Sequence, residues 1–349
     1  MSGFDSTTTR IDQLVADVGV GRVKSPLDAL AARRFYFVTG KGGVGKTTIT
    51  AALALAMAAR GKSVLIAMCN TKERLSALLG SPPIGDKVVR VAENVSAVNM
   101  IPETAVHEYG EMILKSKTVT NALFGNKYVQ AFFRAVPGLH EWTMLGKAWF
   151  HTTETDKNEA NRFDVVLLDA PATGHGLDML RVPKVILDVV PPGALRRDAE
   201  RAWTLFKDDT KAGVIVVTLP EELPVTETEE LITALKRELG LPLSQVVVNG
   251  VLAPLFDDAE RPPLLGATSL LDLRAPALAT TAARAAAVAG ARRAVREEVQ
   301  LESLRRLHAF LAMNGASVSW LPFLFDEAST KRGTEILADE FLQRTVIGR

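Results

Sequence analysis

One glycine-rich segment has the residue types and the spacing for binding phosphate. It follows the apolar run Phe35–Thr39, precedes a helix predicted from Thr47 to Ala59, and reads Gly40, Lys41, Gly42, Gly43, Val44, Gly45, Lys46, Thr47, Thr48. Glycines let backbone N–H groups converge on phosphate oxygens, and the helix N-terminus adds partial positive charge. Because the GxxxxGK[ST] spacing stands between a strand and a helix, it predicts a nucleotide-phosphate site. We expect Lys46 to contact the β- and γ-phosphates and the Thr47 hydroxyl to bind Mg²⁺.

A strand that ends in an acid supplies the second candidate for chemistry. The run from Asp164 to Asp169 is apolar between its two ends. This pattern suits a Walker B strand, in which Asp169 holds Mg²⁺ through water. Strands that end in aspartate are common, so the pattern gains weight only from the residues that follow it.

Those following residues, together with the phosphate loop, resemble one family. The string GKGGVGKT resembles the deviant Walker A loop of the ArsA-type ATPases, the arsenical pump-driving family that includes the eukaryotic tail-anchored-protein targeting ATPase. MinD/ParA-type ATPases and nitrogenase iron protein share this loop more distantly. The segment Asp169–Leu177 resembles the switch segment of the ArsA-type family, in which His175 either takes part in the switch or is a surface histidine. The resemblance runs from about residue 34 to residue 342, and it implies a P-loop ATPase that uses ATP and Mg²⁺.

The resemblance also implies roles for residues outside these two motifs. Lys41 is expected to cross a dimer interface and reach the nucleotide of the opposing subunit, as an arginine finger does. Glu221 is expected to contact nucleotide or that facing lysine, with a solvated acid as the alternative. Asn249 is expected to bind the edge of adenine, while Pro322 and Phe323 belong to a segment that closes over the base.

Three features depart from the pattern of the family. Asn70 stands where the family has the aspartate that positions and polarises the attacking water. An amide orients a water but accepts no proton, so we expect slow or partner-dependent turnover; Glu73 substitutes only if the loop rearranges. Cys69 is the single cysteine, so the chain lacks the zinc-binding and arsenite-binding cysteines of metal-using relatives. Arsenite pumps fuse two units, whereas one phosphate loop identifies a single-unit, bacterial-type member that needs a second chain, identical or paralogous.

These motifs require elements that hold them at the ends of parallel strands. Apolar, β-branched runs are typical of strands buried on both faces, and helical segments between them indicate βαβ units. The predicted fold is therefore α/β, a doubly wound and mostly parallel sheet, with 1–33 as an N-terminal extension and 34–349 as a single P-loop ATPase domain. The predicted strands are Phe35–Thr39, Ser63–Met68, Val95–Met100, Asp164–Asp169, Val214–Leu219, Gln245–Asn249 and Val318–Leu321.

Two long segments without strands interrupt this alternation. Residues from about 101 to 161 and from about 257 to 315 are expected to form a helical subdomain on the α/β core. Their apolar residues are either core or the lining of a groove for a hydrophobic, membrane-protein client. One helical face is predicted to carry Leu301, Leu304, Leu307 and Leu311.

Composition limits the possible classes of function. The chain has 349 residues, 41 Lys plus Arg against 40 Asp plus Glu, and a formal net charge of +1. This balance argues against a protein dominated by nucleic-acid binding, where a strongly basic face is usual. The N-terminus lacks the apolar core of a signal peptide, and no apolar run reaches the ~20 residues of a membrane span. We therefore expect a cytoplasmic protein without an integral membrane segment.

The leading hypothesis is a dimeric ATPase that closes around ATP and Mg²⁺ and couples closure to client binding by the helical subdomain. The alternative is a non-catalytic, nucleotide-dependent subunit of a heteromer with an active paralogue, which the Asn70 substitution favours. A MinD/ParA-like positioning ATPase fits poorly, because the C-terminal residues from Arg332 to Arg349 are mixed in charge. The matches after the phosphate loop also disfavour a P-loop metabolic kinase.

Overall fold

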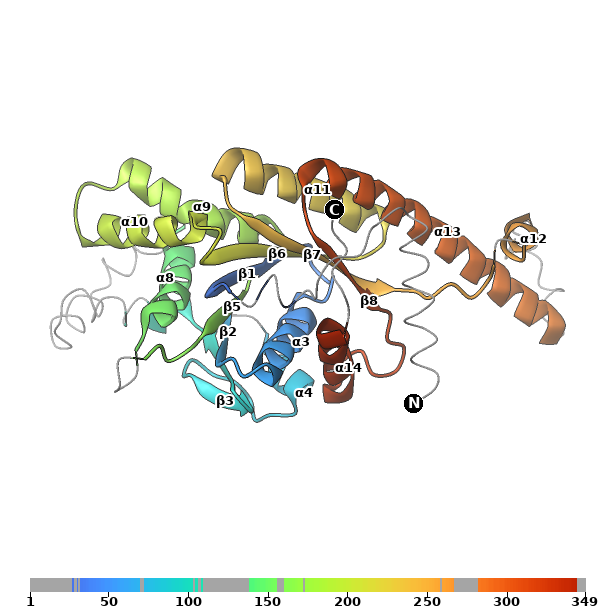
Figure 1. The fold of residues 1–349 in the computed structure, drawn as a ribbon, viewed down its shortest axis with the longest axis horizontal. Helices are drawn as coiled ribbons and strands as arrows, with labels where there is room; N and C mark the ends of the chain where they lie inside the picture. Colours follow the sequence, from blue (N-terminus) through green and yellow to red (C-terminus); the bar gives the residue numbers. More distant parts are fainter. Residues whose placement is uncertain are drawn as a thin grey trace.

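A computed structural model describes residues 32–69, 72–102, 138–155, 160–171, 173–257, 259–266 and 282–343, with the isolated positions 27, 30, 104, 105 and 108. Its centre is an eight-stranded sheet in the order β3-β4-β2-β5-β1-β6-β7-β8 (Figure 1). All neighbouring strands are parallel except β3, which runs antiparallel to β4. The strands are β1 Phe35–Thr39, β2 Val64–Cys69, β3 Val89–Ala92, β4 Val95–Met100, β5 Val165–Asp169, β6 Ala212–Thr218, β7 Leu243–Val251 and β8 Val318–Pro322.

Helices cover both faces of this sheet, because alternate residues of each strand point to opposite faces. Phe35 and Phe37 of β1 pack in the cluster that contains α8, α9, α10, α11 and α13, whereas Tyr36 and Val38 pack in the cluster that contains α3, α4 and α14. The helices are α3 Lys46–Ala59, α4 Leu75–Leu79, α8 Leu139–Thr153, α9 Thr173–Val189, α10 Ala194–Lys207, α11 Glu222–Ala234, α12 Arg261–Gly266, α13 Ala282–Asn314 and α14 Lys331–Gln343, with a π-helix at Leu235–Leu239 directly after α11. The prediction of a doubly wound, mostly parallel α/β sheet is confirmed.

All seven predicted strands are present, and β1 and β4 have the predicted bounds. The sequence prediction missed β3, a four-residue edge strand in which Val89 and Arg90 are exposed. Among the described strands it pairs with β4 alone, and the pairing is irregular between Arg90 and Ala92. A short, half-exposed edge strand lacks the apolar run by which buried strands are identified.

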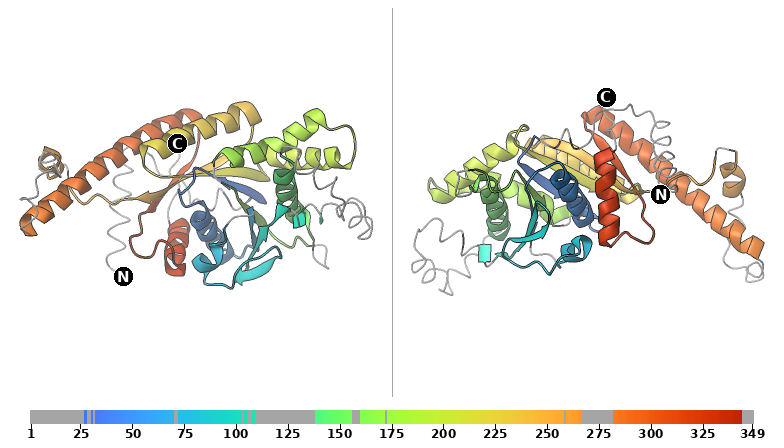
Figure 2. Two further views of the ribbon diagram at one scale, coloured as in Figure 1. Left: turned by 180° about the vertical axis from the view of Figure 1, so that it is seen from behind. Right: turned by 60° about the horizontal axis from the view of Figure 1, so that its bottom comes forward.

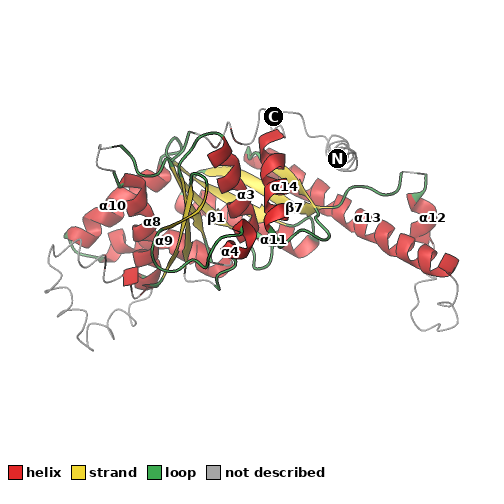
Figure 3. Cartoon of the chain, turned by 90° about the horizontal axis from the view of Figure 1, so that it is seen from below, coloured by secondary structure: helices red, strands yellow, loops and turns green. Residues whose placement is uncertain are grey.

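The two segments predicted to form a helical subdomain are described in part. The first contains α8, in which Trp142 is fully buried in the same core cluster as β1 and β5. In the second segment, Leu301, Leu304, Leu307 and Leu311 of α13 are buried, so these four leucines belong to the core rather than to an exposed groove. The opposite end of α13 projects beyond the sheet and carries α12 beside it, as Figures 2 and 3 show from three further directions. That these segments form one separate subdomain stays a prediction.

Two described positions of the predicted N-terminal extension belong to the core. Leu27 and Leu30 are buried in the cluster that contains α3 and α14. The buried Tyr36 hydroxyl donates a 2.6 Å hydrogen bond to the Leu30 carbonyl, which fixes this position to the central strand. Within the described residues, no helix combines the length and the apolarity needed to cross a bilayer.

Candidate functional site

The glycine-rich segment forms a tight loop between β1 and α3, at the carboxyl end of the sheet's central strands. Gly40, Gly43 and Gly45 have φ values of 147°, 86° and 92°, where side chains are disfavoured. A Cβ on Gly40 would lie 2.1 Å from the Val217 carbonyl oxygen of β6, so only glycine lets the loop pass this strand. Gly45 is the N-cap of α3, and the first turn of α3 therefore opens toward the loop. This geometry suits an anion held by backbone N–H groups.

The Lys46 side chain is hydrogen-bonded to the backbone of the phosphate loop. Its Nζ donates hydrogen bonds to the carbonyl oxygens of Gly40 at 3.1 Å and Lys41 at 2.9 Å. Burial lowers the pKa of this ammonium, and the nearby Asp169 carboxylate opposes that shift. A phosphate oxygen is a stronger acceptor for the ammonium than these neutral carbonyls, because the bond to it is charge-assisted on both sides.

Thr47 and Asp169 meet as the sequence predicts for a Mg²⁺ site. The Thr47 Oγ1 donates a 2.6 Å hydrogen bond to Oδ2 of Asp169, which ends β5 beside β1. The other carboxylate oxygen, Oδ1, is buried without a hydrogen-bond partner in the described residues. Burial raises the pKa of Asp169 to about 6, against the lowering effects of Thr47, Lys46 and Thr50.

These donors fit Mg²⁺ better than a transition metal. A hydroxyl and a carboxylate are the hard oxygen ligands that Mg²⁺ takes together with water and substrate phosphates. Among the described residues, no group of three His, Cys, Asp or Glu side chains is placed to hold a metal ion on its own. Cys69 is buried, and burial, with the nearby Asp169 charge, raises the pKa of its thiol, so its thiolate form is disfavoured.

Lys41, the second lysine of the loop, forms an ion pair within its own chain. Its Nζ lies 2.6 Å from Oε1 of Glu227 in α11, and the two side chains are 27% and 29% exposed. The sequence prediction for Glu221 concerns the nucleotide or the facing lysine of a second subunit, so it stays a prediction, and Glu227 is an additional acid that it did not name. Within this chain, Glu221 precedes α11 as its N-cap and is exposed. The string Thr226-Glu227-Thr228-Glu229 was the available signal for Glu227, but it did not specify which glutamate faces the loop.

Asn249 joins β7 to the phosphate loop. Its Nδ2 donates a 3.0 Å hydrogen bond to the Val44 carbonyl, directly before Gly45. A Cβ on Gly45 would come within 2.5 Å of this Nδ2, so the amide lies against the start of α3. The Asn249 side chain is therefore beside the loop, and its role in binding the base stays a prediction.

The residues predicted to close over the base lie near Asn249. Pro322 ends β8 and is buried, and the Phe323 N–H donates a 2.9 Å hydrogen bond to the Val251 carbonyl. The Arg296 guanidinium of α13 lies over the Phe323 ring, 5.5 Å from its centroid. A cavity of about 320 Å³ adjoins this group; its lining is Pro220, Glu221, Gly250, Leu252, Arg296, Val299 and Gln300. Sequence reasoning missed Arg296, which no motif marks.

The switch segment packs against the end of β1. Gly176 lies at the start of α9, where an added Cβ would come within 2.9 Å of Thr39 Oγ1 and 3.1 Å of the Pro171 carbonyl oxygen. Thr39 Oγ1 is buried without a partner in the described residues. Glycine therefore brings the switch segment close to the strand that carries the phosphate loop. The side chain of His175 lies outside the described part of the structure.

The loop between β2 and α4 contains the predicted departure from the family. Asn70 lies outside the described residues, so its predicted role stays a prediction. Glu73, the possible substitute acid, accepts hydrogen bonds from the Ser76 N–H at 2.7 Å and the Ser76 hydroxyl at 2.6 Å. Its carboxylate thus stabilises the first turn of α4.

Comparison with known proteins gives a consistent result. A family model described as "Anion-transporting ATPase" matches residues 33–191 and 194–261. ATPase BagA of Mycobacterium tuberculosis is 33% identical over 225 residues, which cover 63% of this chain and 66% of that protein. ATPase GET3 of Kluyveromyces lactis is 23% identical over 66% of this chain and 75% of that protein. A putative arsenical pump-driving ATPase of Halobacterium salinarum is 25% identical over 64% of this chain and 36% of that protein.

Proposed function

This chain belongs to the anion-transporting ATPase family, and from this premise we propose that it is a dimeric switch that binds ATP with Mg²⁺, closes, and reopens after slow hydrolysis. The contact between Thr47 and Asp169 carries the proposal. It joins the phosphate loop to the neighbouring strand and leaves one buried carboxylate oxygen without a partner among the described residues. A hydroxyl and an available carboxylate beside a phosphate loop are the protein groups that an ATPase of this kind needs.

Each group of the site has a separate task in nucleotide binding. Backbone N–H groups of the loop bind the phosphates, and Lys46 exchanges the carbonyls of Gly40 and Lys41 for β- and γ-phosphate oxygens. Thr47 and Asp169 would hold Mg²⁺, which supplies charge neutralisation between the phosphates when it is bound. Asn249, Pro322 and Phe323 bind the adenine. Asn249 lies beside the loop, and Phe323 is hydrogen-bonded to Val251 of the same strand β7, which supports this assignment.

Dimer closure is the proposed task of Lys41. In the single chain its ammonium pairs with Glu227, and both side chains are partly exposed. Ion pairs of this exposure contribute only about 0–1 kcal/mol, so a triphosphate on a facing subunit competes well for the lysine. Release from Glu227 would let Lys41 reach that nucleotide and stabilise the charge that develops during hydrolysis.

Slow turnover follows from Asn70. An amide in that position orients the attacking water without accepting its proton. The alternative proposal is a pseudo-ATPase subunit that binds nucleotide only to hold a heteromer with an active paralogue. The same Asn70 favours it, and the two proposals differ in whether the isolated chain completes repeated cycles of hydrolysis.

We propose that the switch binds a hydrophobic client, such as a membrane-protein segment. The proposed location of the protein is the cytoplasm. The arm formed by α12 and the projecting end of α13 supports a binding role. None of the residues of α12 is buried, and Leu255, which precedes it, is 58% exposed. An exposed apolar side chain next to a projecting arm is available to a partner.

The decisive experiment measures ATP binding and hydrolysis by the purified chain, with Mg²⁺ or with excess EDTA. The switch proposal expects Mg²⁺-dependent ATP binding, multiple turnovers at a low rate, and dimers in sedimentation velocity with a non-hydrolysable ATP analogue. Lys46→Met is expected to remove all three. Binding without multiple turnover, restored by a paralogous chain, would support the pseudo-ATPase alternative, and failure to bind ATP would contradict both.

A further inference from the structure

Side chains of α13 hold the chain segment that leaves β7, the strand of Asn249. Gln300 is bonded to both backbone groups of Leu252: its Oε1 accepts from the Leu252 N–H at 2.8 Å, and its Nε2 donates to the Leu252 carbonyl at 3.0 Å. Glu297 accepts a 2.9 Å hydrogen bond from the Leu255 N–H. Gln300 and Glu297 are each 4% exposed, so these bonds are shielded from water. They fix the position of α13 relative to the end of β7.

Arg296 lies on α13 directly before Glu297 and one turn before Gln300. Its guanidinium lies over the Phe323 ring, 5.5 Å from the ring centroid. It also lines the cavity of about 320 Å³, together with Gly250 and Gln300. Because residues four apart are neighbours on a helix surface, the hydrogen bonds of Gln300 hold the part of α13 from which Arg296 projects. The guanidinium is therefore placed at the end of β7 by an anchored helix.

The Phe323 ring packs beside the end of β7 as well. A Cβ built on Gly250 would lie 3.6 Å from Cδ2 of this ring, and the Phe323 N–H is bonded to the Val251 carbonyl. The ring also meets the Phe325 ring edge to face, with 4.8 Å between the centroids. Phe325 is 72% exposed, so it gives its neighbour little support. The orientation of the Phe323 ring therefore depends on Arg296.

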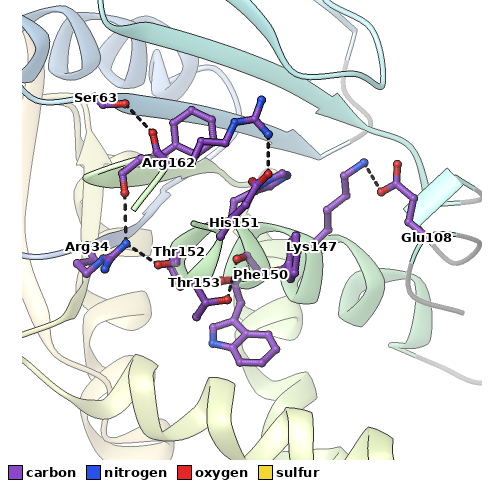
Figure 4. A network of polar contacts seen from close by, with 12 residues as sticks. Arg34, Ser63, Glu108, Lys147, Phe150, His151, Thr152, Thr153 and Arg162 are labelled. Carbon is purple, nitrogen blue, oxygen red and sulfur yellow. Dashed lines mark hydrogen bonds and ion pairs between the residues drawn. The ribbon is translucent and has the colours of Figure 1, made fainter. Parts of the chain in front are cut away.

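Arg296 has no competing ionic partner in the described residues. The carboxylate next to it, that of Glu297, is held by Arg293 at 2.6 Å. In the polar network of Figure 4, by contrast, Lys147 and Glu108 form an ion pair. An exposed arginine without an ion pair ordinarily extends into water, and here the face of an aromatic ring holds the guanidinium.

We propose that Arg296 is a positioning residue for the base of the bound nucleotide. Its guanidinium attracts the electron-rich face of Phe323 and keeps this ring where it covers the base, near Asn249. The inference rests on the proposed function, because it concerns the same adenine site. It adds to that site a residue of α13, the helix that continues into the projecting arm.

Isothermal titration of the full chain with Mg²⁺ tests the proposal with two probes, a non-hydrolysable ATP analogue and inorganic tripolyphosphate, which has no base. Arg296→Gln removes the charge and is expected to weaken the ATP analogue about threefold, as an exposed cation–π contact allows, and to leave tripolyphosphate unchanged. Arg296→Lys keeps a cation over the ring and should restore most of the affinity. Arg292→Gln, at an exposed position one turn earlier on α13, removes the same charge and should bind both probes like the wild type.

A double-mutant cycle shows whether Arg296 acts through the ring. In a Phe323→Leu background, Arg296→Gln is expected to cause no further loss of affinity for the ATP analogue. The full threefold loss in that background would overturn the proposal, because Arg296 would then act without Phe323. Equal weakening of both probes by Arg296→Gln would overturn it too, since a general loss of positive charge weakens any triphosphate.

Failure of this proposal is distinguishable from failure of the nucleotide site itself. A wild-type chain that binds neither probe contradicts the proposed function, and this inference with it. If the wild type prefers the ATP analogue and Arg296→Gln has the same preference, only the role of Arg296 is overturned. Equal wild-type affinity for the two probes would show that the base adds nothing, which overturns the role of Arg296 and leaves the phosphate and Mg²⁺ site standing.

Discussion

Thr47 Oγ1 and Asp169 Oδ2 lie 2.6 Å apart, and this hydrogen bond connects the first turn of α3 to the end of β5. It is the point at which two separate motifs of the sequence become one site. Asp169 is buried, and Oδ1 has no partner in the described residues, so the site keeps a carboxylate whose charge is only partly satisfied. Such a group lowers stability in return for an oxygen ligand that is available to a cation.

The pH dependence of stability should reveal the cost of that carboxylate. Burial raises the pKa of Asp169 to about 6, above its ordinary value of 3.8. The native state therefore holds this proton more tightly than the unfolded state, and stability falls as pH rises from about 4 through 6. The Asp169→Asn variant has no carboxyl to ionise here, so it does not lose stability in this way as pH rises. We expect it to be more stable than the wild type at pH 7.5 by at most about 3 kcal/mol.

Urea denaturation without Mg²⁺ at pH 4.5, 6.0 and 7.5 measures this difference. The advantage of Asp169→Asn should shrink toward zero at the lowest pH. Asp188→Asn, at an exposed position of α9, is the control and should give no pH-dependent gain. A constant difference between Asp169→Asn and the wild type across the three pH values would contradict the assigned pKa.

The ion pair between Lys41 and Glu227 predicts opposite effects of two substitutions. Glu227→Gln removes the partner that holds the lysine and is expected to change the free energy of unfolding by less than about 1 kcal/mol. Because it frees Lys41 for a facing nucleotide, it should increase ATP-dependent dimerisation. Lys41→Met should leave ATP binding by the single chain nearly unchanged but lower hydrolysis by on the order of 10³-fold.

Sedimentation velocity and the dependence of the hydrolysis rate on protein concentration measure these effects. Glu222→Gln, an exposed glutamate on the same helix, is a matched control for Glu227→Gln. If Glu227→Gln and Glu222→Gln dimerise alike, Glu227 does not restrain the lysine. If Lys41→Met hydrolyses ATP at the wild-type rate, the lysine has no role across an interface.

Asn70 predicts a gain of function. Asn70→Asp introduces the acid that the resemblance to the family implies at this position, and an acid that accepts the proton of the attacking water contributes on the order of 10²-fold to a rate. Single-turnover hydrolysis with excess protein is the appropriate measurement, because it excludes product release. Lys72→Gln, in the same loop, is the control for nonspecific effects. An unchanged rate in Asn70→Asp would eliminate this position as the limit on chemistry.

Local sequence determined the parts of the fold that depend on burial. β1 has the predicted bounds because its residues form a run that is buried throughout, and β4 has them because four of its six residues are buried. The edge strand β3 was missed because Val89 and Arg90 are exposed and give no such run. Prediction from one sequence therefore succeeds for strands in which burial restricts the residue types. It fails for the exposed strand at the edge of the sheet.

The residues of the candidate site also fall into two groups, those that local sequence predicted and those that it missed. Local sequence identified Lys46, Thr47 and Asp169, because the loop before a helix is a local pattern and the acid at the strand end gained weight from the segment that follows it. Glu227 and Arg296 were missed because they reach the site from α11 and α13. Their positions depend on how those helices pack on the sheet, so no short motif contains the information.

Two glycines of the phosphate loop should respond differently to alanine. Both have positive φ, so alanine at either position is strained by about 1–2 kcal/mol. A Cβ at Gly43 meets nothing within 4 Å, whereas one at Gly40 would lie 2.1 Å from the Val217 carbonyl oxygen. Gly40→Ala must therefore displace the backbone of β6, and we expect it to cost at least about 3 kcal/mol of stability, against about 1–2 kcal/mol for Gly43→Ala. Urea denaturation without nucleotide measures both costs, and equal values would show that the loop moves away from β6 without resistance.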